Sequence, residues 1–171
     1  VPLEKFYMAL MKVTPSVHRI TADELTYSLH PILRFEMEKD WFDGKTKTKD
    51  FQEIWNAKYQ EAFGLMPKDA REGVLQDIHW ASGHVGYFQS YTLGNLYGGM
   101  LLEAMEQDIP QWEQQMAKGE FSAINGWLHE HVHQYGMAIP PQQLLRQVTG
   151  KDLTEEPFLH YLRRRYLTKL R

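Results

Sequence analysis

The chain has 171 residues with a formal net charge of −3 and a pI near 6.3, so it lacks the basic surplus typical of nucleic-acid-binding proteins. It contains no cysteine, which excludes disulfides and thiolate metal sites and is compatible with a cytoplasmic location. No apolar run approaches the roughly 20 residues of a membrane span. The first residue is Val1, and we expect the chain to be a segment of a longer protein, folded as a single helical domain over residues 1–171.

Apolar residues recur at helical spacing along most of the chain, and no segment alternates with the period of two that a half-buried strand requires. Pro31 should either kink the helical pattern of residues 22–42 at His30 and Pro31 or split it there, because proline inside a helix removes a backbone hydrogen bond. Gly94, Gly98 and Gly99 indicate close approach of a neighbouring backbone. Helices are expected over residues 3–13, 22–42, 51–63, 87–107, 111–117, 121–135, 142–149 and 156–167. The sequence therefore predicts an all-α fold of roughly eight helices.

Thr21, with Glu24 three residues later, forms a capping-box pattern that predicts a helix start near Ala22. Arg19 is then left just outside the helix N-terminus. A guanidinium group beside free helix N–H groups is well placed to hold a carboxylate, because its planar fork matches two oxygens. A surface ion pair with Asp23 or Glu24 is the simpler alternative for this arginine.

Residues 73–91 concentrate hydrogen-bonding side chains between three glycines. The side chains that can donate a hydrogen bond to an oxygen are Gln76, His79, Tyr87 and Tyr91. Asp77 could orient a histidine by accepting its second N–H. Such a set suits an oxyanion, either a substrate carboxylate or a developing tetrahedral intermediate. The simpler alternative is that His79 and Trp80 are satisfied core residues.

His129, Glu130 and His133 satisfy the zinc motif HExxH. On one helix the two histidines would lie a turn apart and could ligate a zinc ion, while Glu130 could activate a water molecule. The long form of this motif requires a third histidine at a position that Ile139 occupies here. A third ligand would have to come from elsewhere, and a self-contained zinc peptidase is therefore an alternative.

Two motifs give the chain a resemblance to a known family. Residues 73–80, GVLQDIHW, fit GxxQDxHW, and Arg19, Ala22 and Asp23 fit IRxxAD, with His18 in place of its isoleucine. Residues 86–95 also resemble the stretch that follows the histidine motif in this family, with Gln89 at a position where proline is usual. Over nearly its whole length, the chain resembles the C-terminal part of the carboxypeptidase Taq family of zinc metallocarboxypeptidases.

The resemblance implies a helical fold, a deep substrate groove, a homodimer and removal of single residues from peptide C-termini. It also implies that the zinc ligands lie upstream of this chain, and that residues 129–133 match a helix that binds no catalytic metal. Arg19 would hold the substrate carboxylate, and His79 with Tyr87, or alternatively Tyr91, would stabilise the oxyanion. Gln76 and Asp77 would hold these residues in position along one wall of the substrate groove. A catalytically silent helical module for peptide binding or dimerisation is the remaining alternative.

Overall fold

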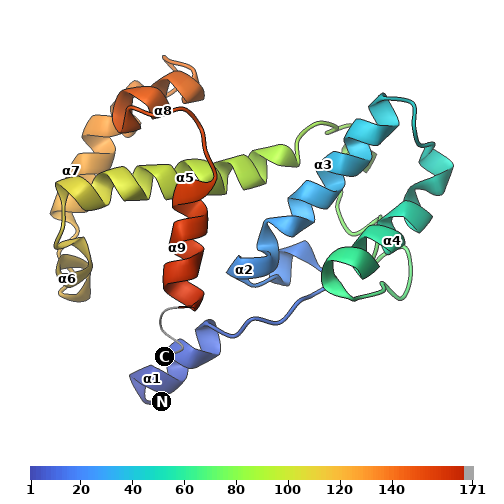
Figure 1. Cartoon of the computed structure of the whole chain (residues 1–171), viewed down its shortest axis with the longest axis horizontal. Helices are drawn as coiled ribbons and strands as arrows, with labels where there is room; N and C mark the ends of the chain where they lie inside the picture. Colours follow the sequence, from blue (N-terminus) through green and yellow to red (C-terminus); the bar gives the residue numbers. More distant parts are fainter. Residues whose placement is uncertain (168–171) are drawn as a thin grey trace. The chain divides into compact units, whose positions relative to one another are not determined.

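The structure is a computed structural model that describes residues 1–167, and every regular element in those residues is helical (Figure 1). The predicted all-α class is therefore confirmed. The chain divides into two compact units, Val1–Leu93 and Gly94–Arg171, and each is described by itself. None of the helices in the described residues is both long and apolar enough to cross a membrane.

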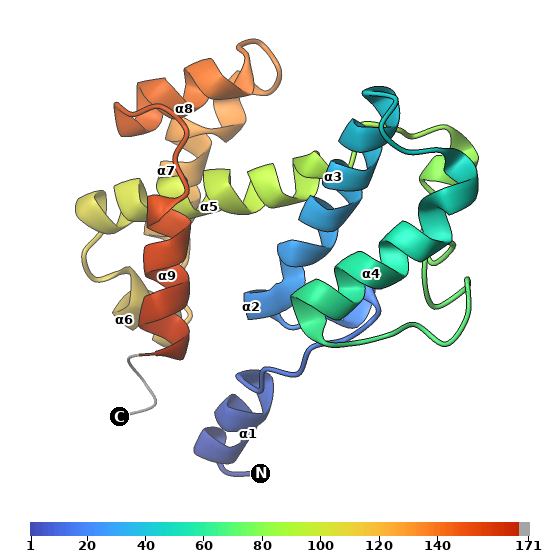
Figure 2. The same cartoon turned by 45° about the vertical axis from the view of Figure 1, so that its right-hand side comes forward.

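The first unit is built around the packing of α3 against α4 (Figures 1 and 2). Its α-helices are α1 (Leu3–Leu10), α2 (Glu24–Tyr27), α3 (Leu29–Phe42), α4 (Phe51–Phe63) and the first turn of α5 (Gln89–Asp108). Its core is the cluster Leu33, Met37, Trp55 and Tyr59, all at most 9% exposed. The rings of Trp55 and Tyr59 stack with centroids 4.8 Å apart, which makes α4 an aromatic wall against α3.

Proline and glycine end the helices of this unit largely as predicted. Pro31 lies in the first turn of α3, where its missing N–H costs no helical hydrogen bond, and Ser28 separates α3 from α2. Gly64 ends α4 in the left-handed conformation, with φ of 67°. The helix expected over residues 3–13 is shorter, because α1 ends at Leu10.

The predicted cap at Thr21 is wrong by two residues. Arg19–Thr21 form a turn of 3-10 helix and Ala22 is extended, so the α-helix begins only at Glu24. The capping side chain is Asp23, whose Oδ1 accepts a hydrogen bond from the backbone N of Thr26 at 2.9 Å. This local geometry turns Arg19 toward the interior of the unit.

The second unit contains the rest of α5, α6 (Trp112–Ala117), α7 (Ser122–His131), α8 (Pro141–Thr149) and α9 (Glu156–Tyr166). Helix α9 crosses α5 in both views (Figures 1 and 2). At this crossing a Cβ on Gly99 would lie 2.7 Å from the Cα of Phe158, so only glycine fits. The predicted close approach is confirmed at Gly99. It is wrong at Gly94 and Gly98, where a Cβ would meet nothing within 4 Å.

Candidate functional site

Asp77 is the centre of the polar cluster in the first unit. Its Oδ1 accepts from Nη2 and Nε of Arg19 at 2.9 and 3.3 Å, and its Oδ2 accepts from Nε of Arg34 at 2.7 Å. The Asp77 side chain is only 6% exposed. Burial alone would raise its pKa, but the charges and hydrogen bonds of Arg34 and Arg19 outweigh burial and hold the pKa below its usual range. Asp77 is therefore a carboxylate shared by two guanidinium groups.

The expected hydrogen bond from a histidine to Asp77 is not formed. Nδ1 of His79 lies 3.9 Å from Oδ1 of Asp77, which is beyond hydrogen-bond distance. The oxygen is already engaged by Arg19, so Asp77 orients guanidinium groups instead of an imidazole.

Gln76 links three parts of the first unit. Its Nε2 donates to the carbonyl oxygens of Val17 and Glu72, at 2.9 and 2.7 Å. Its Oε1 accepts from Nη2 of Arg34 at 3.0 Å and from the backbone N of Arg19 at 3.2 Å. Both amide hydrogens are used within the protein, so Gln76 positions the cluster and has no N–H left for a ligand.

Arg34 is the member of the cluster that the sequence analysis missed. It lies on α3, its side chain is fully buried, and its guanidinium carbon lies 4.4 Å from the ring centroid of Trp55. Besides Asp77 and Gln76, it donates from Nη1 to the carbonyl oxygen of His30 at 2.7 Å and to the hydroxyl of Tyr59 at 3.2 Å. Its one sequence signal is its position on the same helix face as Leu33 and Met37, where a charge is unexpected.

Arg19 differs from Arg34 in how much of its guanidinium is engaged. Its ion pair is with Asp77, and the alternative of a surface pair with Asp23 or Glu24 is wrong. Its Nη1 makes one long hydrogen bond, 3.5 Å to the hydroxyl of Tyr27. Its guanidinium carbon lies 4.7 Å from the ring centroid of Tyr91. The outer edge, from Nη1 to Nη2, thus keeps donors for a ligand.

The cluster carries an excess positive charge. Two guanidinium groups share one carboxylate, and the imidazoles of His30 and His79 are neutral near pH 7. Burial and the charge of Arg34 lower the pKa of His30 from 6.5 to about 4. Burial, with the charges of Arg19, His84 and Arg34, also lowers the pKa of His79, although Asp77 opposes this change. Such a cluster favours an anionic ligand.

His79 lies between two tyrosines next to this charge. Its Nε2 is 3.0 Å from the hydroxyl oxygen of Tyr91, within hydrogen-bond distance. Its ring stacks on Tyr87, with centroids 5.7 Å apart, and packs at a tilt against the buried Phe88, with centroids 4.6 Å apart. Tyr87 lies two residues before α5 begins, so the helix expected from residue 87 starts later than predicted, and the rings of Tyr87 and Tyr91 are in edge contact.

The tautomer of His79 decides which group can donate to a ligand. If Nε2–H donates to Tyr91, the hydroxyl hydrogen of Tyr91 is left for an oxygen of the ligand. Tyr87 is 49% exposed and presents a second hydroxyl beside the same imidazole. The structure thus brings together Arg19, Gln76, Asp77, His79, Tyr87 and Tyr91, as the sequence predicted.

Trp80 anchors the end of the same stretch. Its Nε1 donates to Oε1 of Glu38 at 2.7 Å, and Glu38 is 3% exposed. The indole also packs edge-on against Trp55, with centroids 6.1 Å apart. Trp80 is therefore partly buried against the core, which agrees with the simpler alternative for this residue but not with a ligand contact.

The HExxH segment does not have the geometry of a zinc site. Helix α7 ends at His131, Val132 leaves the helical region with φ of −129°, and His133 begins a separate 3-10 turn. The expected single helix over residues 121–135 is therefore wrong. His129, Glu130 and His133 are all exposed. Among residues 1–167, no group of three or more histidine, aspartate or glutamate side chains could hold a metal ion.

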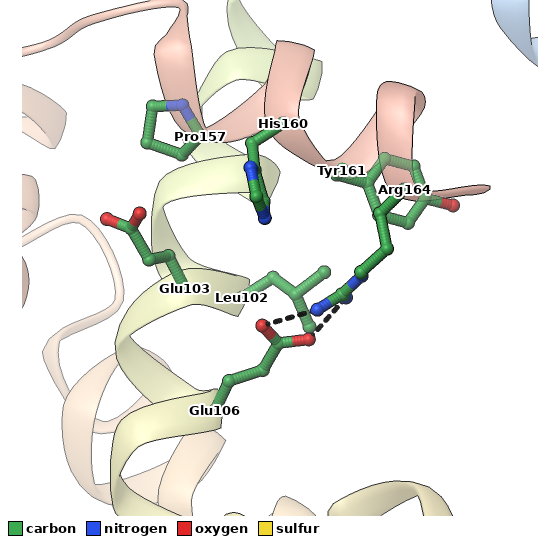
Figure 3. A pocket seen from close by; sticks show the side chains of 8 residues that line it. Leu102, Glu103, Glu106, Pro157, His160, Tyr161 and Arg164 are labelled. Carbon is green, nitrogen blue, oxygen red and sulfur yellow. Dashed lines mark hydrogen bonds and ion pairs between the residues drawn. The ribbon is translucent and has the colours of Figure 1, made fainter. Parts of the chain in front are cut away.

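A small pocket in the second unit is also polar, but its charges are paired internally (Figure 3). Arg164 donates from Nη1 and Nη2 to the two carboxylate oxygens of Glu106, at 3.1 and 2.5 Å. Lys151 donates to Glu103 at 2.8 Å. In Figure 3 the ring of His160 points from α9 toward Leu102 on α5. This pocket lacks the excess positive charge of the Asp77 cluster.

Comparison with known proteins places the chain among peptidases. Residues 1–166 match the sequence profile of the family described as carboxypeptidase Taq (M32) metallopeptidase. Thermostable carboxypeptidase 1 of Thermus thermophilus is 41% identical over 97% of this chain and 32% of its own length. Carboxypeptidase 1 of Bacillus subtilis is 40% identical over 97% of this chain and 33% of its own length.

A solved structure agrees with this assignment. The crystal structure of an M32 carboxypeptidase from Deinococcus radiodurans R1 superposes with a TM-score of 0.92 at 40% identity, covering 95% of this chain and 33% of that protein. The chain thus spans about a third of the length of the relatives it matches. This coverage is consistent with the C-terminal portion that the motifs predicted.

Proposed function

Because the chain belongs to the carboxypeptidase Taq (M32) metallopeptidase family, we propose that it forms the C-terminal substrate groove of a zinc-dependent carboxypeptidase. Such an enzyme removes single residues from peptide C-termini, and its substrate carries a carboxylate at the residue to be released. The observation that carries the proposal is the excess positive charge at Arg19, whose outer edge keeps donors next to His79 and Tyr91. An exopeptidase needs a group of this kind to select the chain end.

The described residues do not fit a catalytic metal, because no three candidate ligands come together among them. We therefore place the zinc ligands in the part of the family fold with which this chain does not align. No step of the reaction is assigned to a metal in this chain.

Arg19 is the group that we assign to the substrate carboxylate. Asp77 engages Nη2 and Nε through a single oxygen and Tyr27 accepts one Nη1 hydrogen, which leaves one hydrogen on Nη1 and the second on Nη2. A carboxylate can accept two parallel hydrogen bonds from that edge, and such a bidentate pair is stronger than one between neutral groups. The ring of Tyr91 under the guanidinium, 4.7 Å away, shields one face of Arg19 from water.

His79 with Tyr87, or alternatively with Tyr91, is the donor pair that we assign to the oxyanion. The lowered pKa of His79 keeps the imidazole neutral near pH 7, so it acts as a hydrogen-bond donor and not as a cation. Removing one such donor from an oxyanion site costs about 3 kcal/mol of transition-state stabilisation. Gln76 and Asp77 act by holding Arg19 and the 73–80 stretch in place.

Calorimetric titration with two peptides tests the carboxylate assignment. One is an N-acetylated tripeptide with a free C-terminal carboxylate, and the other is the same peptide as a C-terminal amide. We expect the purified chain to bind the carboxylate form at least about tenfold more tightly, equivalent to about 1.4 kcal/mol. Arg19→Gln should abolish the difference. The matched control is Arg71→Gln, because Arg71 is an arginine with an 89% exposed side chain.

Equal affinity of the wild-type chain for the two peptides, or an unchanged preference in Arg19→Gln, would remove Arg19 from the site.

Turnover is measured in the same samples with added zinc, by chromatography of released amino acids. We expect binding without turnover from this chain. Release of C-terminal residues that is lost in His133→Ala would instead support a self-contained zinc peptidase.

A further inference from the structure

We propose that Arg34 is a positioning residue that keeps Arg19 available for a carboxylate, because it holds Asp77 away from a two-oxygen pair with Arg19. The proposal rests on the proposed function of Arg19 and extends it to a residue of α3 that no ligand reaches. Arg34 acts entirely through Asp77.

Arg34 cannot itself bind a substrate. Its side chain is fully buried, and it donates to four acceptors within the protein, which are Asp77, Gln76, the His30 carbonyl and Tyr59. A guanidinium group has five N–H donors, so at most one is left. The charge of Arg34 is therefore closed off from solvent, and Arg19, whose side chain is 10% exposed, is the member of the pair that an anion can reach.

The two arginines divide the carboxylate of Asp77 between them. Oδ2 receives Nε of Arg34 at 2.7 Å, and only Oδ1 faces Arg19. A free carboxylate beside an arginine prefers to engage it with both oxygens along two parallel hydrogen bonds. Without Arg34, Asp77 would be free to turn both oxygens to Arg19. That arrangement would use the same Nε and Nη2 donors as now, but Asp77 would neutralise Arg19 alone and leave it less positive charge for a substrate carboxylate.

A second set of contacts fixes Arg34 itself. The hydroxyl of Tyr59 accepts from Nη1 of Arg34 and lies 2.9 Å from Nδ1 of His30, and Tyr59 is fully buried. Trp55 covers one face of the guanidinium. Helix α4 thus sets the position of Arg34, and through Asp77 it sets the position of Arg19. Stability alone does not require this arrangement, because a buried ion pair is often no more stabilising than apolar side chains of similar volume.

Three variants test the proposal with the carboxylate and amide peptides. Arg34→Gln removes the charged guanidinium group and most of its N–H donors. It should reduce affinity for the carboxylate peptide by tenfold or more while leaving affinity for the amide peptide unchanged. Arg34→Lys keeps the charge and should recover part of the lost affinity. Tyr59→Phe removes one contact of Arg34 without altering any charge, and it should reduce carboxylate affinity by a few-fold. Circular dichroism confirms that each variant is folded.

A merely structural role for Arg34 predicts a different result. Affinity for both peptides would then fall together, in proportion to the loss of folded protein, and Arg34→Lys would give no selective recovery. Either outcome would overturn the proposal while the carboxylate preference of the wild type, and with it the proposed function, still stood.

A measurement without any peptide separates the two ideas completely. Nitrogen-15 NMR at low temperature follows hydrogen exchange at the guanidinium of Arg19. We expect hydrogen exchange at Nε of Arg19 to be slower in Arg34→Gln than in the wild type, as Asp77 turns both oxygens to Nε and Nη2 of Arg19. Unchanged exchange in this variant would overturn the positioning role, even if the wild type bound carboxylates selectively.

Discussion

The two compact units differ in what they bury. In Val1–Leu93 the buried residues include four polar or charged ones, Arg19, His30, Arg34 and Glu38. The two arginines pair with Asp77, and Glu38 accepts a hydrogen bond from Trp80. In the described part of Gly94–Arg171 the buried residues are apolar or aromatic, as at Met100, Trp127 and Phe158, while the HExxH histidines are exposed. Both units contain a motif rich in histidine and carboxylates. Only in the first does folding bring its side chains into a shared, buried charge network, and this is what makes that motif informative about function.

The largest effect should come from removing Asp77. Asp77→Ala leaves two guanidinium groups without their shared carboxylate in a buried site, and one of them has no access to water. Breaking a buried ion pair in this way costs about 3–5 kcal/mol. Urea unfolding of the two proteins at pH 7 measures the loss.

The control for this prediction is Asp43→Ala. Asp43 also pairs with two cations, Lys39 and Lys45, but its side chain is 43% exposed. Its loss should leave stability nearly unchanged, since exposed ion pairs are screened by solvent. If Asp77→Ala and Asp43→Ala lost equal stability, the cluster around Asp77 would not be the buried network described above.

The next effect is a loss of stability in acid that depends on His30. Burial and the charge of Arg34 lower the pKa of His30 from 6.5 to about 4, so the imidazole stays neutral in the folded protein. The unfolded chain binds a proton first as pH falls from 6.5, and the folded state loses stability until pH reaches about 4. At about 1.4 kcal/mol per pKa unit, the loss is about 3 kcal/mol in total.

Urea unfolding at pH 7 and at pH 4.5 measures this dependence. In His30→Gln the side chain no longer titrates, so the variant should lose less stability between these two pH values than the wild type. His160→Gln, at an exposed position of the second unit, should keep the dependence of the wild type. An equal loss in the wild type and His30→Gln would assign the acid sensitivity to other groups.

A smaller effect is expected at the apolar crossing in the second unit. Gly99→Ala would place a Cβ within 2.7 Å of the backbone of Phe158, so α5 and α9 would have to separate. Overpacking of this kind costs about 1–3 kcal/mol. Gly98→Ala is the matched control, because its Cβ meets nothing within 4 Å. This alanine should be neutral or stabilise the helix by about 0.5–1 kcal/mol. Thermal unfolding of both variants checks the contrast, which a similar change in the two would contradict.

The part of the fold that could be predicted was set by local chemistry. The helix over residues 51–63 has the observed bounds, because a periodic apolar face precedes Gly64, which adopts a left-handed conformation. Pro31 predicted the start of α3, because proline lacks a backbone N–H wherever it occurs and is tolerated in the first turn of a helix. By contrast, Val132 interrupts the helix before His133 without a glycine or proline at that point, so no local signal announced the break.

The sequence predicted most of the residues that form the site, but not which of them contact each other. Arg19 and residues 76–79 were expected together on motif grounds, and they do meet, although they are 57 or more residues apart. Arg34 was missed because pairing with Asp77 spans 43 residues and no periodicity encodes it. For the same reason Asp77 was expected to accept a hydrogen bond from a histidine and not from two arginines. An arginine on the apolar face of a helix was the one available sign of a buried partner.

The smallest effect should come from the HExxH histidines, and it completes the contrast between the units. His129 and His133 are exposed and lie on different elements, α7 and the 3-10 turn that follows it. Surface substitutions away from buried contacts usually change stability by no more than about 0.5 kcal/mol, so His129→Ala and His133→Ala should unfold like the wild type. Equilibrium dialysis with zinc should find the same zinc content in all three proteins, because a tight site needs three or four ligands in fixed geometry. One equivalent of zinc in the wild type, absent from both variants, would mean that the segment from His129 to His133 rearranges into a metal site. The functional assignment would then move from the buried charges of the first unit to the exposed histidines of the second.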